Sequence, residues 1–213
     1  ISQNVKFSKF DLKIELPGIS KKLIKNIKVP TIGMHNVRNA AASVAVSSSV
    51  GISENIIKRA LSEFEGVQRR FTKVFTYNNV SFYDDYAHHP TEIKEVMNGI
   101  SEVYKKKKII CIFQPHRISR LRALRKEFSY AFSKANTVVL CPIYKAGESI
   151  KLGFKYINFA KEIIKNSKVK LFVINNNNEL AKFLKKNMYG KKIVIGMGAG
   201  SISNWIRKLP ELM

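Results

Sequence analysis

The sequence contains few acidic residues, two cysteines and no long apolar segment. No run of about 18 apolar residues occurs, so no membrane-spanning helix is predicted. The first ten residues, ISQNVKFSKF, lack the apolar core of a signal peptide. Because the first residue is Ile rather than Met, we expect further protein upstream. Cys111 and Cys141 lie in apolar, strand-like runs, which predicts buried thiols in a reducing cytoplasm rather than metal ligands.

The scarcity of acids leaves a large positive charge. Lys and Arg total 38 against 15 Asp and Glu, a net charge of +23. Such a charge is typical of nucleic-acid-binding proteins. Here the excess is mostly lysine and is spread along the whole chain, and aromatic residues do not alternate with the basic ones as a base-stacking groove requires. We therefore interpret the charge as compositional drift, compatible with small anionic substrates and with no nucleic-acid partner.

Short apolar runs alternate with helical patterns in the C-terminal two thirds of the chain. This alternation predicts an α/β domain with a Rossmann-like, mostly parallel sheet and helices on both faces. The predicted strands are 80–83, 109–113, 137–141, 170–174 and 192–195, and the predicted helices are 90–104, 119–134, 156–165, 178–186 and 202–209.

The N-terminal third has a different pattern. Residues 5–30 alternate loosely and break at Pro17-Gly18, which predicts short strands and a hairpin. Helices are expected from His35 to about Val50 and from Ser53, as the N-cap, to about Phe64. We place a domain boundary just after Phe71, which gives domains 1–71 and 72–213.

The segment from Phe82 to Glu92, FYDDYAHHPTE, gathers carboxylates, phenols and imidazoles beside a proline that suits a first helical turn. Its acids should end a strand, at the sheet edge where α/β folds bind ligands. A polar surface loop is the alternative. Adjacent strand residues point to opposite faces, so Asp84 and Asp85 cannot easily serve one site. We favour Asp85 as the functional acid and interpret Asp84 as a cap or hinge contact.

Basic residues form two further groups. Arg117 and Arg120 follow the next strand, three residues apart at a helix start, so they can converge on one carboxylate. Arg69 and Arg70 precede the predicted boundary, where a guanidinium can bind phosphate oxygens. For both groups the alternative is a solvated basic surface.

Two other motifs occur in the sequence. His35, Asn36 and Asn39 begin a helix, where an amide can read an adenine edge and an imidazole can stack on it, or where all three merely cap the helix. The glycine-rich run 196–201, GMGAGS, looks like a dinucleotide loop but follows the last strand, so tight strand–helix packing is favoured. No GxxxxGKS or GxxxxGKT phosphate loop occurs.

Five motifs in order carry a resemblance to a known family: GMHNVRNAAA at 33–42, GVQRRF at 66–71, DDYAHHPTEI at 84–93, FQPHRISR at 113–120 and GAGSI at 198–202. The sequence resembles the Mur ligases over residues 30 to 213. The resemblance implies an ATP-dependent ligase of cell-wall synthesis that joins UDP-N-acetylmuramate to L-alanine through an acyl phosphate. It also implies that residues 1–71 end the ATP-binding central domain and that 72–213 form the C-terminal domain. The phosphate loop, the Mg²⁺ ligands and the UDP-binding domain would lie upstream of Ile1, so that this chain alone is inactive and holds no metal.

The resemblance also implies roles for individual residues. ATP would be bound by His35, Asn36, Asn39, Arg70 and Asp85, with Arg70 at the γ-phosphate. The amino acid would be bound by Tyr86, His88, His116, Arg117 and Arg120, and catalysis would depend on Arg70, Asp85 and His88. Ala87 and Ile118 depart from the family pattern, which bears on the shape of the pocket rather than on its charges.

Three alternatives remain open. Another Mur-type ligase, such as the one that recycles murein tripeptide, has a similar acid and histidine motif but lacks the Gln-Pro-His-Arg sequence after the next strand. A basic nucleic-acid-binding α/β module and a non-catalytic remnant are alternatives from other classes.

Overall fold

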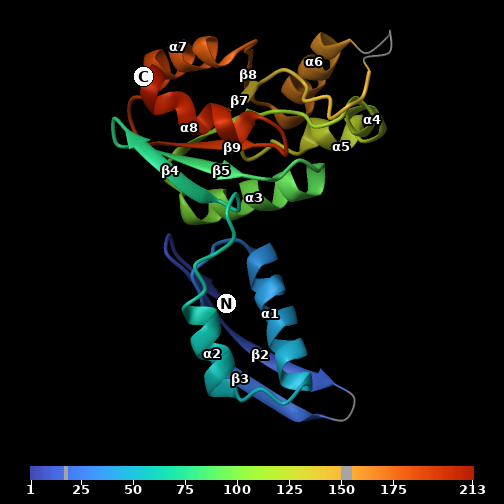
Figure 1. Ribbon diagram of the computed structural model, residues 1–213, viewed down its shortest axis with the longest axis vertical. Helices are drawn as coiled ribbons and strands as arrows, with labels where there is room; N and C mark the ends of the chain where they lie inside the picture. Colours follow the sequence, from blue (N-terminus) through green and yellow to red (C-terminus); the bar gives the residue numbers. More distant parts are fainter. Residues whose placement is uncertain (17–18, 150–154) are drawn as a thin grey trace. The chain divides into compact units, whose positions relative to one another are not determined.

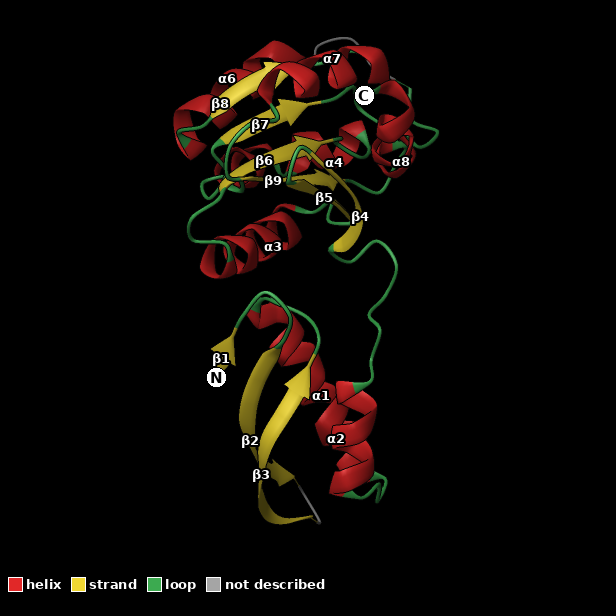
Figure 2. Cartoon of the chain, turned by 90° about the vertical axis from the view of Figure 1, so that its left-hand side faces the viewer, coloured by secondary structure: helices red, strands yellow, loops and turns green. Residues whose placement is uncertain are grey.

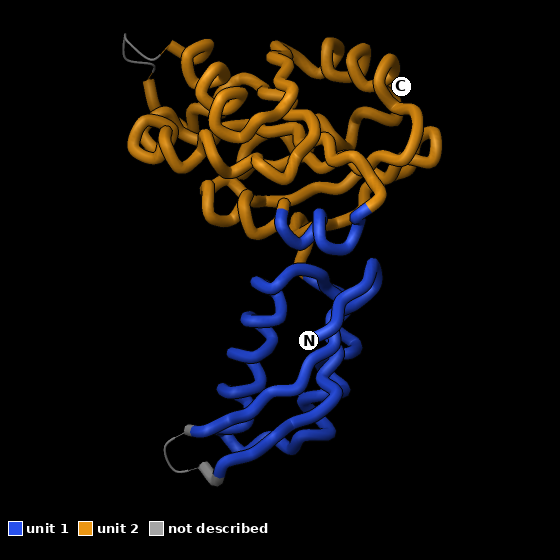
Figure 3. The backbone as a smooth tube through the Cα atoms, turned by 180° about the vertical axis from the view of Figure 1, so that it is seen from behind, with its two compact units in different colours: residues 1–66, 98–105 blue, residues 67–97, 106–213 orange. Residues whose placement is uncertain are grey.

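The computed structural model describes residues 1–16, 19–149 and 155–213. Its elements are shown in Figure 1. The chain divides into two compact units, one of residues 1–66 with 98–105 and one of residues 67–97 with 106–213 (Figure 3). The predicted Pro17-Gly18 break lies outside the described residues. No helix in the described part of the chain has the length and apolar character needed to cross a membrane.

The first unit consists of an antiparallel sheet covered by two helices. Its strands are β1 (Ser2–Gln3), β2 (Ser8–Leu16) and β3 (Ile19–Val29), and its helices are α1 (Met34–Ser49) and α2 (Glu54–Ser62). Strands are present where they were predicted, but β2 and β3 are nine and eleven residues long rather than short. Both predicted helices are confirmed, and Ser53 is the N-cap of α2, although its side chain makes no capping hydrogen bond. Apolar side chains from strands and helices share one core, including Phe10, Ile24, Ile27 and Val44.

The second unit contains the predicted sheet of mostly parallel strands. The strands are β4 (Thr72–Tyr77), β5 (Val80–Asp85), β6 (Lys108–Phe113), β7 (Thr137–Leu140), β8 (Lys170–Val173) and β9 (Lys192–Met197). They lie in the order β4-β5-β9-β6-β7-β8. Only the β4–β5 pair is antiparallel among the strand pairs of this sheet in the described residues. The α/β fold class is thereby confirmed.

Helices cover both faces of this sheet. They are α3 (Pro90–Val103), α4 (Ile118–Ala123), α5 (Arg125–Tyr130), α6 (Tyr156–Ser167), α7 (Asn177–Asn187) and α8 (Ile202–Leu212). Ile110 and Ile112 of β6 belong to the core formed with α7 and α8. The next residue of β6, Phe113, points the other way and contacts Phe128 of α5. Figures 1 and 2 show α3 on the opposite side of β5 from α8.

One local prediction was wrong, and one strand was not predicted. The helix predicted over 119–134 is broken at Leu124 (φ −112°, ψ 26°) into α4 and α5. No glycine or proline marks this break, so periodicity alone predicted one helix. Strand β4 was missed because its apolar pattern is weak. It joins β5 through Asn78 and Asn79, which both have positive φ, as a two-residue hairpin of the primed type requires.

Candidate functional site

Strand order determines which loops meet at the carboxyl edge of the large sheet. Because β9 lies between β5 and β6, the glycine-rich loop after β9 begins between the acidic end of β5 and the basic segment after β6. The parallel register pairs Asp85 of β5 with Met197 of β9, and Met197 with Phe113 of β6. The acidic end of β5, the glycine-rich loop after β9 and the basic segment after β6 therefore lie at the same level of one edge.

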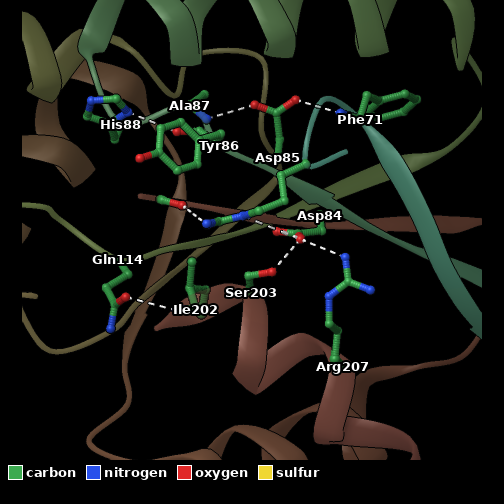
Figure 4. Close-up of polar contacts among 12 residues, drawn as sticks. Phe71, Asp84, Asp85, Tyr86, Ala87, His88, Gln114, Ile202, Ser203 and Arg207 are labelled. Atoms are coloured by element: carbon green, nitrogen blue, oxygen red, sulfur yellow. Dashed lines mark hydrogen bonds and ion pairs between the residues drawn. The ribbon is translucent and has the colours of Figure 1, made fainter. Parts of the chain in front are cut away.

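Asp84 is completely buried, and the donor side chains around it converge on Oδ2, whereas Oδ1 has no hydrogen-bond partner among the described residues (Figure 4). Its Oδ2 accepts a hydrogen bond from Ser203 Oγ at 2.5 Å and lies 3.5 Å from Arg207 Nη2, both on α8. Arg69 Nε lies 3.7 Å from the same oxygen. Asp84 therefore links β5 to the last helix and to the segment before β4, which is a structural role. Ser203 and Arg207 were not predicted, because only tertiary structure brings them to β5.

The neighbouring arginines are separated in space. Arg69 donates from Nη2 to the Gly198 carbonyl at 2.7 Å, and its guanidinium lies 4.6 Å from the centre of the Tyr86 ring. Arg70 is exposed. Of the two, Arg70 is therefore the residue available for a phosphate, whereas Arg69 ties Tyr86 to the loop after β9.

Asp85 is buried, and its carboxylate binds two backbone groups. Its Oδ2 accepts from the Phe71 N–H and its Oδ1 from the Ala87 N–H, each at 2.8 Å (Figure 4). Burial raises the pKa of Asp85 to about 6, although the two N–H donors and then Arg70 act to lower it. The acid therefore holds the segment before β4 against the end of β5.

This burial predicts a pH-dependent stability. A folded-state pKa of about 6 against an unfolded value near 3.8 means that ionising Asp85 costs the folded state about 3 kcal/mol. That cost is absent well below pH 4, grows between about pH 4 and pH 6, and is complete above pH 6. The free energy of unfolding of the parent protein should therefore fall by about 3 kcal/mol between pH 4 and pH 7, and that of Asp85→Asn should not show this fall. Urea unfolding followed by Trp205 fluorescence would measure both. Glu127→Gln, which changes an exposed acid of α5, is the control. If the free energies of unfolding of Asp85→Asn and the parent differ by the same amount at pH 4 and at pH 7, this account is wrong.

The start of α3 fixes the two histidines. Glu92 Oε2 accepts from the N–H groups of His88 at 3.0 Å and His89 at 3.2 Å, as the third residue of a helix does in a capping box. His88 Nδ1 lies 2.9 Å from the Tyr86 carbonyl oxygen and 3.4 Å from Glu92 Oε2. His89 Nδ1 accepts from the Thr91 N–H. His89 therefore belongs to the hydrogen-bonded start of α3, whereas the ring of His88 lies against that of Tyr86.

Aromatic rings connect the segments after β5 and β6. The ring centres of Tyr86 and His88 are 5.2 Å apart, and those of His88 and His116 are 5.6 Å apart. His116 Nδ1 lies 3.4 Å from Arg120 Nη1. Burial lowers the pKa of His116 first, and the charges of His88, Arg120 and Arg117 lower it further, so the ring is favoured neutral at pH 7. Arg117 is exposed beside this row. The five residues predicted for amino-acid binding therefore share one end of the sheet.

The glycine-rich loop is a packing element. Gln114 Oε1 accepts from the Ile202 N–H at 2.9 Å (Figure 4), and its amide nitrogen donates to Ser201 Oγ at 3.0 Å. A Cβ on Gly200 would lie 2.4 Å from Tyr144 Cγ, and one on Gly198 would lie 2.8 Å from the Gln114 carbonyl oxygen. The prediction of tight strand–helix packing in place of a dinucleotide loop agrees with these contacts.

The three residues predicted to contact adenine lie in the other unit. Helix α1 has Gly33 as its N-cap, so His35, Asn36 and Asn39 are inside the helix and the capping alternative is wrong. Asn36 Nδ2 donates to the Ile32 carbonyl at 2.8 Å, and Asn39 is exposed.

A metal site does not form from the described residues, since no three His, Cys, Asp or Glu side chains among them are arranged to hold an ion. Both oxygens of Asp85 accept backbone hydrogen bonds, and Asp84 is engaged by Ser203 and arginines. Cys111 and Cys141 are buried free thiols, as predicted from their apolar surroundings.

Comparison with known proteins identifies relatives of the chain. The family model described as "Mur ligase, glutamate ligase domain" matches residues 69–200. UDP-N-acetylmuramate–L-alanine ligase of Pelagibacter ubique is 61% identical over 213 residues, which are 100% of this chain and 46% of that protein. The enzyme of the same name from Rickettsia bellii is 39% identical over 221 residues, covering 99% of this chain and 45% of that protein. The chain thus spans about half the length of the curated relatives it matches.

Solved structures share the fold. UDP-N-acetylmuramate-alanine ligase from Thermotoga maritima superposes with a TM-score of 0.72 at 29% identity, over 90% of this chain and 42% of that one. A murein peptide ligase from Psychrobacter arcticus gives a TM-score of 0.67 at 19% identity, over 100% of this chain and 42% of that one, which supports the fold alone.

Proposed function

The chain belongs to the Mur ligase family, and we propose that it forms the C-terminal part of an ATP-dependent UDP-N-acetylmuramate:L-alanine ligase of peptidoglycan synthesis. The observation that carries the proposal is the cluster at the sheet edge, where His116 contacts both His88 and Arg120 beside the exposed Arg117. The 61% identity to the Pelagibacter ubique ligase supports the choice of L-alanine.

In this proposal Arg117 and Arg120 bind the carboxylate of L-alanine. Guanidinium groups remain charged and form paired hydrogen bonds with carboxylates. A neutral His116 adds a hydrogen-bonding group without adding charge, and Tyr86, held by Arg69, shapes the side-chain pocket. His88 lies between Tyr86 and His116, where it helps orient the amine. The main contribution of these residues to catalysis is positioning of the nucleophile.

The other substrate groups are assigned to residues nearer the N-terminus. ATP would phosphorylate the muramate carboxylate, the amine would attack the acyl phosphate, and the tetrahedral intermediate would lose phosphate. Arg70, which is exposed, would stabilise negative charge at the γ-phosphate. Asp85 would act by fixing the Arg70–Phe71 segment. His35, Asn36 and Asn39 would contact adenine, with residues 1–71 as the end of the central domain and 72–213 as the C-terminal domain.

Magnesium, which Mur-type chemistry implies, does not fit the two buried acids of the sheet edge, because both oxygens of Asp85 accept backbone hydrogen bonds and Asp84 lies beside two arginines whose positive charge disfavours a second cation. The two buried acids therefore take no part in binding magnesium in this proposal. The proposed location of the protein is the cytoplasm, where its nucleotide substrates are found.

A chimera tests the proposed function. This chain would replace the matching segment of the Pelagibacter ubique ligase, to which it is 61% identical. We expect phosphate release that requires ATP, UDP-N-acetylmuramate and L-alanine together, and no such release from the 213-residue chain alone. A folded but inactive chimera would contradict the proposal. Preference for a murein tripeptide over L-alanine would favour the recycling ligase instead. Tight, sequence-selective DNA binding at physiological salt would favour the nucleic-acid-binding alternative, whereas weak binding that falls steeply with salt is expected.

A further inference from the structure

The loop after β7 contributes a residue that braces the basic segment after β6. The Tyr144 N–H donates to the Pro115 carbonyl at 2.8 Å, and the Tyr144 carbonyl accepts from the Arg117 N–H at 2.9 Å. His116 and Tyr144 are thereby paired as a single parallel β-bridge. The backbone on both sides of His116 is therefore fixed by Tyr144.

The side chain of Tyr144 supports His116 as well. The two rings are stacked, with their centres 5.5 Å apart and their planes 19° apart. On the loop after β9, Gly200 leaves room for the tyrosine, since a Cβ there would lie 2.4 Å from Tyr144 Cγ. Tyr144 is 41% exposed, so the residue is packed in part and remains accessible in part.

Glu148 anchors the start of α4 from outside that helix. The helix has Arg117 as its N-cap, and no side chain caps it from that position. Instead, Glu148 Oε2 accepts from the Ser119 N–H at 3.0 Å and Glu148 Oε1 accepts from Ser119 Oγ at 2.5 Å. A carboxylate is favoured at a helix start, where N–H groups lack partners within the helix.

These supports are needed because the backbone of Arg117 is strained. Its φ of 67° and ψ of 133° lie in a region that a residue with a Cβ rarely adopts. Such a conformation persists only when neighbouring groups hold it, and it is common at functional sites. Tyr144 holds the N–H of Arg117, and Glu148 holds the first turn that follows it.

We propose that Tyr144 and Glu148 are positioning residues that hold His116 and Arg117 in place to bind the carboxylate of the incoming amino acid. The inference rests on the proposed function for the identity of the ligand. The contacts themselves do not depend on it, because all four residues belong to the same unit. Binding groups act efficiently only when surrounding contacts hold them within about 0.5 Å of the required geometry.

The first test uses the 213-residue chain and needs no substrate. NMR titration would follow the imidazole of His116, assigned with His116→Gln. Tyr144→Ala should raise the pKa of His116, because burial is the main cause of its lowering. Glu148→Gln should lower this pKa further, because Glu148 is the acid that opposes the effects of His88, Arg117 and Arg120. Tyr130→Ala and Glu127→Gln, at exposed positions of α5, are the matched controls. Unchanged titration in both test variants would overturn the proposed bracing of His116.

The second test uses the chimera. Tyr144→Ala and Glu148→Gln should each raise the KM for L-alanine about tenfold. This is the lower end of the loss, about tenfold to a hundredfold, that follows when a residue supporting a ligand-binding side chain is removed. The KM for ATP should stay unchanged, a split that general destabilisation would not produce. Ser119→Ala combined with Glu148→Gln should raise the KM for L-alanine by less than the product of the single effects, because the pair shares one contact. An unchanged KM for L-alanine in the two single variants would overturn the positioning role. An inactive parent chimera would instead contradict the proposed function, and the NMR titration would still decide the positioning of His116.

Discussion

Replacing Asp84 by alanine is expected to lower the free energy of unfolding by about 3 kcal/mol. The carboxylate is completely buried, and its Oδ2 is shared by Ser203, Arg207 and Arg69. Removing it leaves the Arg69 guanidinium, whose side chain is only 26% exposed, without the opposite charge beside it. Loss of one partner of a fully buried pair costs roughly 3–5 kcal/mol. The lower end applies here because both arginines retain access to water.

Urea unfolding monitored by Trp205, which lies in α8 between Ser203 and Arg207, measures this effect directly. Arg207→Ala is the matched comparison, since its side chain is 47% exposed and its removal should cost less than about 1 kcal/mol. The loss of stability in Asp84→Asn should lie between those in Asp84→Ala and Arg207→Ala, because an amide oxygen can still accept a hydrogen bond from Ser203. Equal losses for Asp84→Ala and Arg207→Ala would show that Asp84 is not the centre of this cluster.

Arg117→Ala in the chimera is expected to reduce the use of L-alanine about tenfold to a hundredfold while the KM for ATP changes little. A hydrogen bond to a charged group contributes roughly 1.5–3 kcal/mol, which corresponds to this range. Arg117→Lys should recover only part of the loss, because a single ammonium cannot reproduce the paired donors of a guanidinium. Steady-state kinetics with each substrate varied in turn would measure these effects.

Arg70→Ala provides the opposite comparison. This exposed residue should affect phosphoryl transfer and spare the KM for L-alanine. Arg117→Gly separates the side chain of Arg117 from its backbone, because glycine accepts the positive φ without strain. It should lose alanine binding as Arg117→Ala does, yet be the more stable of the two proteins. If Arg117→Ala raises the KM for ATP and leaves the KM for L-alanine unchanged, the roles assigned to Arg117 and Arg70 are reversed.

Local sequence patterns were sufficient for most elements and for part of the candidate site. Short apolar runs of four or five residues predicted β5 to β9, and Pro90 marked the start of α3. The same patterns failed at Leu124, where the chain breaks a helix without glycine or proline. Strand β4 is partly exposed on both faces, which leaves little alternation to detect.

The roles of neighbouring residues were harder to separate. The sequence indicated that Asp84 and Asp85 point to opposite faces, and the structure agrees: Asp84 faces α8, whereas Asp85 binds the Phe71 and Ala87 N–H groups. The burial that raises the pKa of Asp85 could not be read from the motif, because it depends on chain segments that cover the strand end.

The sequence alone was sufficient to identify the family, from five short motifs in order, and to identify the α/β class and the two chemically rich segments, because each of these signals is a local pattern of residues. The position of β9 between β5 and β6, by contrast, emerges only in the folded sheet. Strand order is set by the packing of the whole sheet and its helices, and no local pattern encodes it. That order places Ser203 beside Asp84 and Ile202 beside Gln114, and Tyr144 reaches His116 only through the fold of the loop after β7.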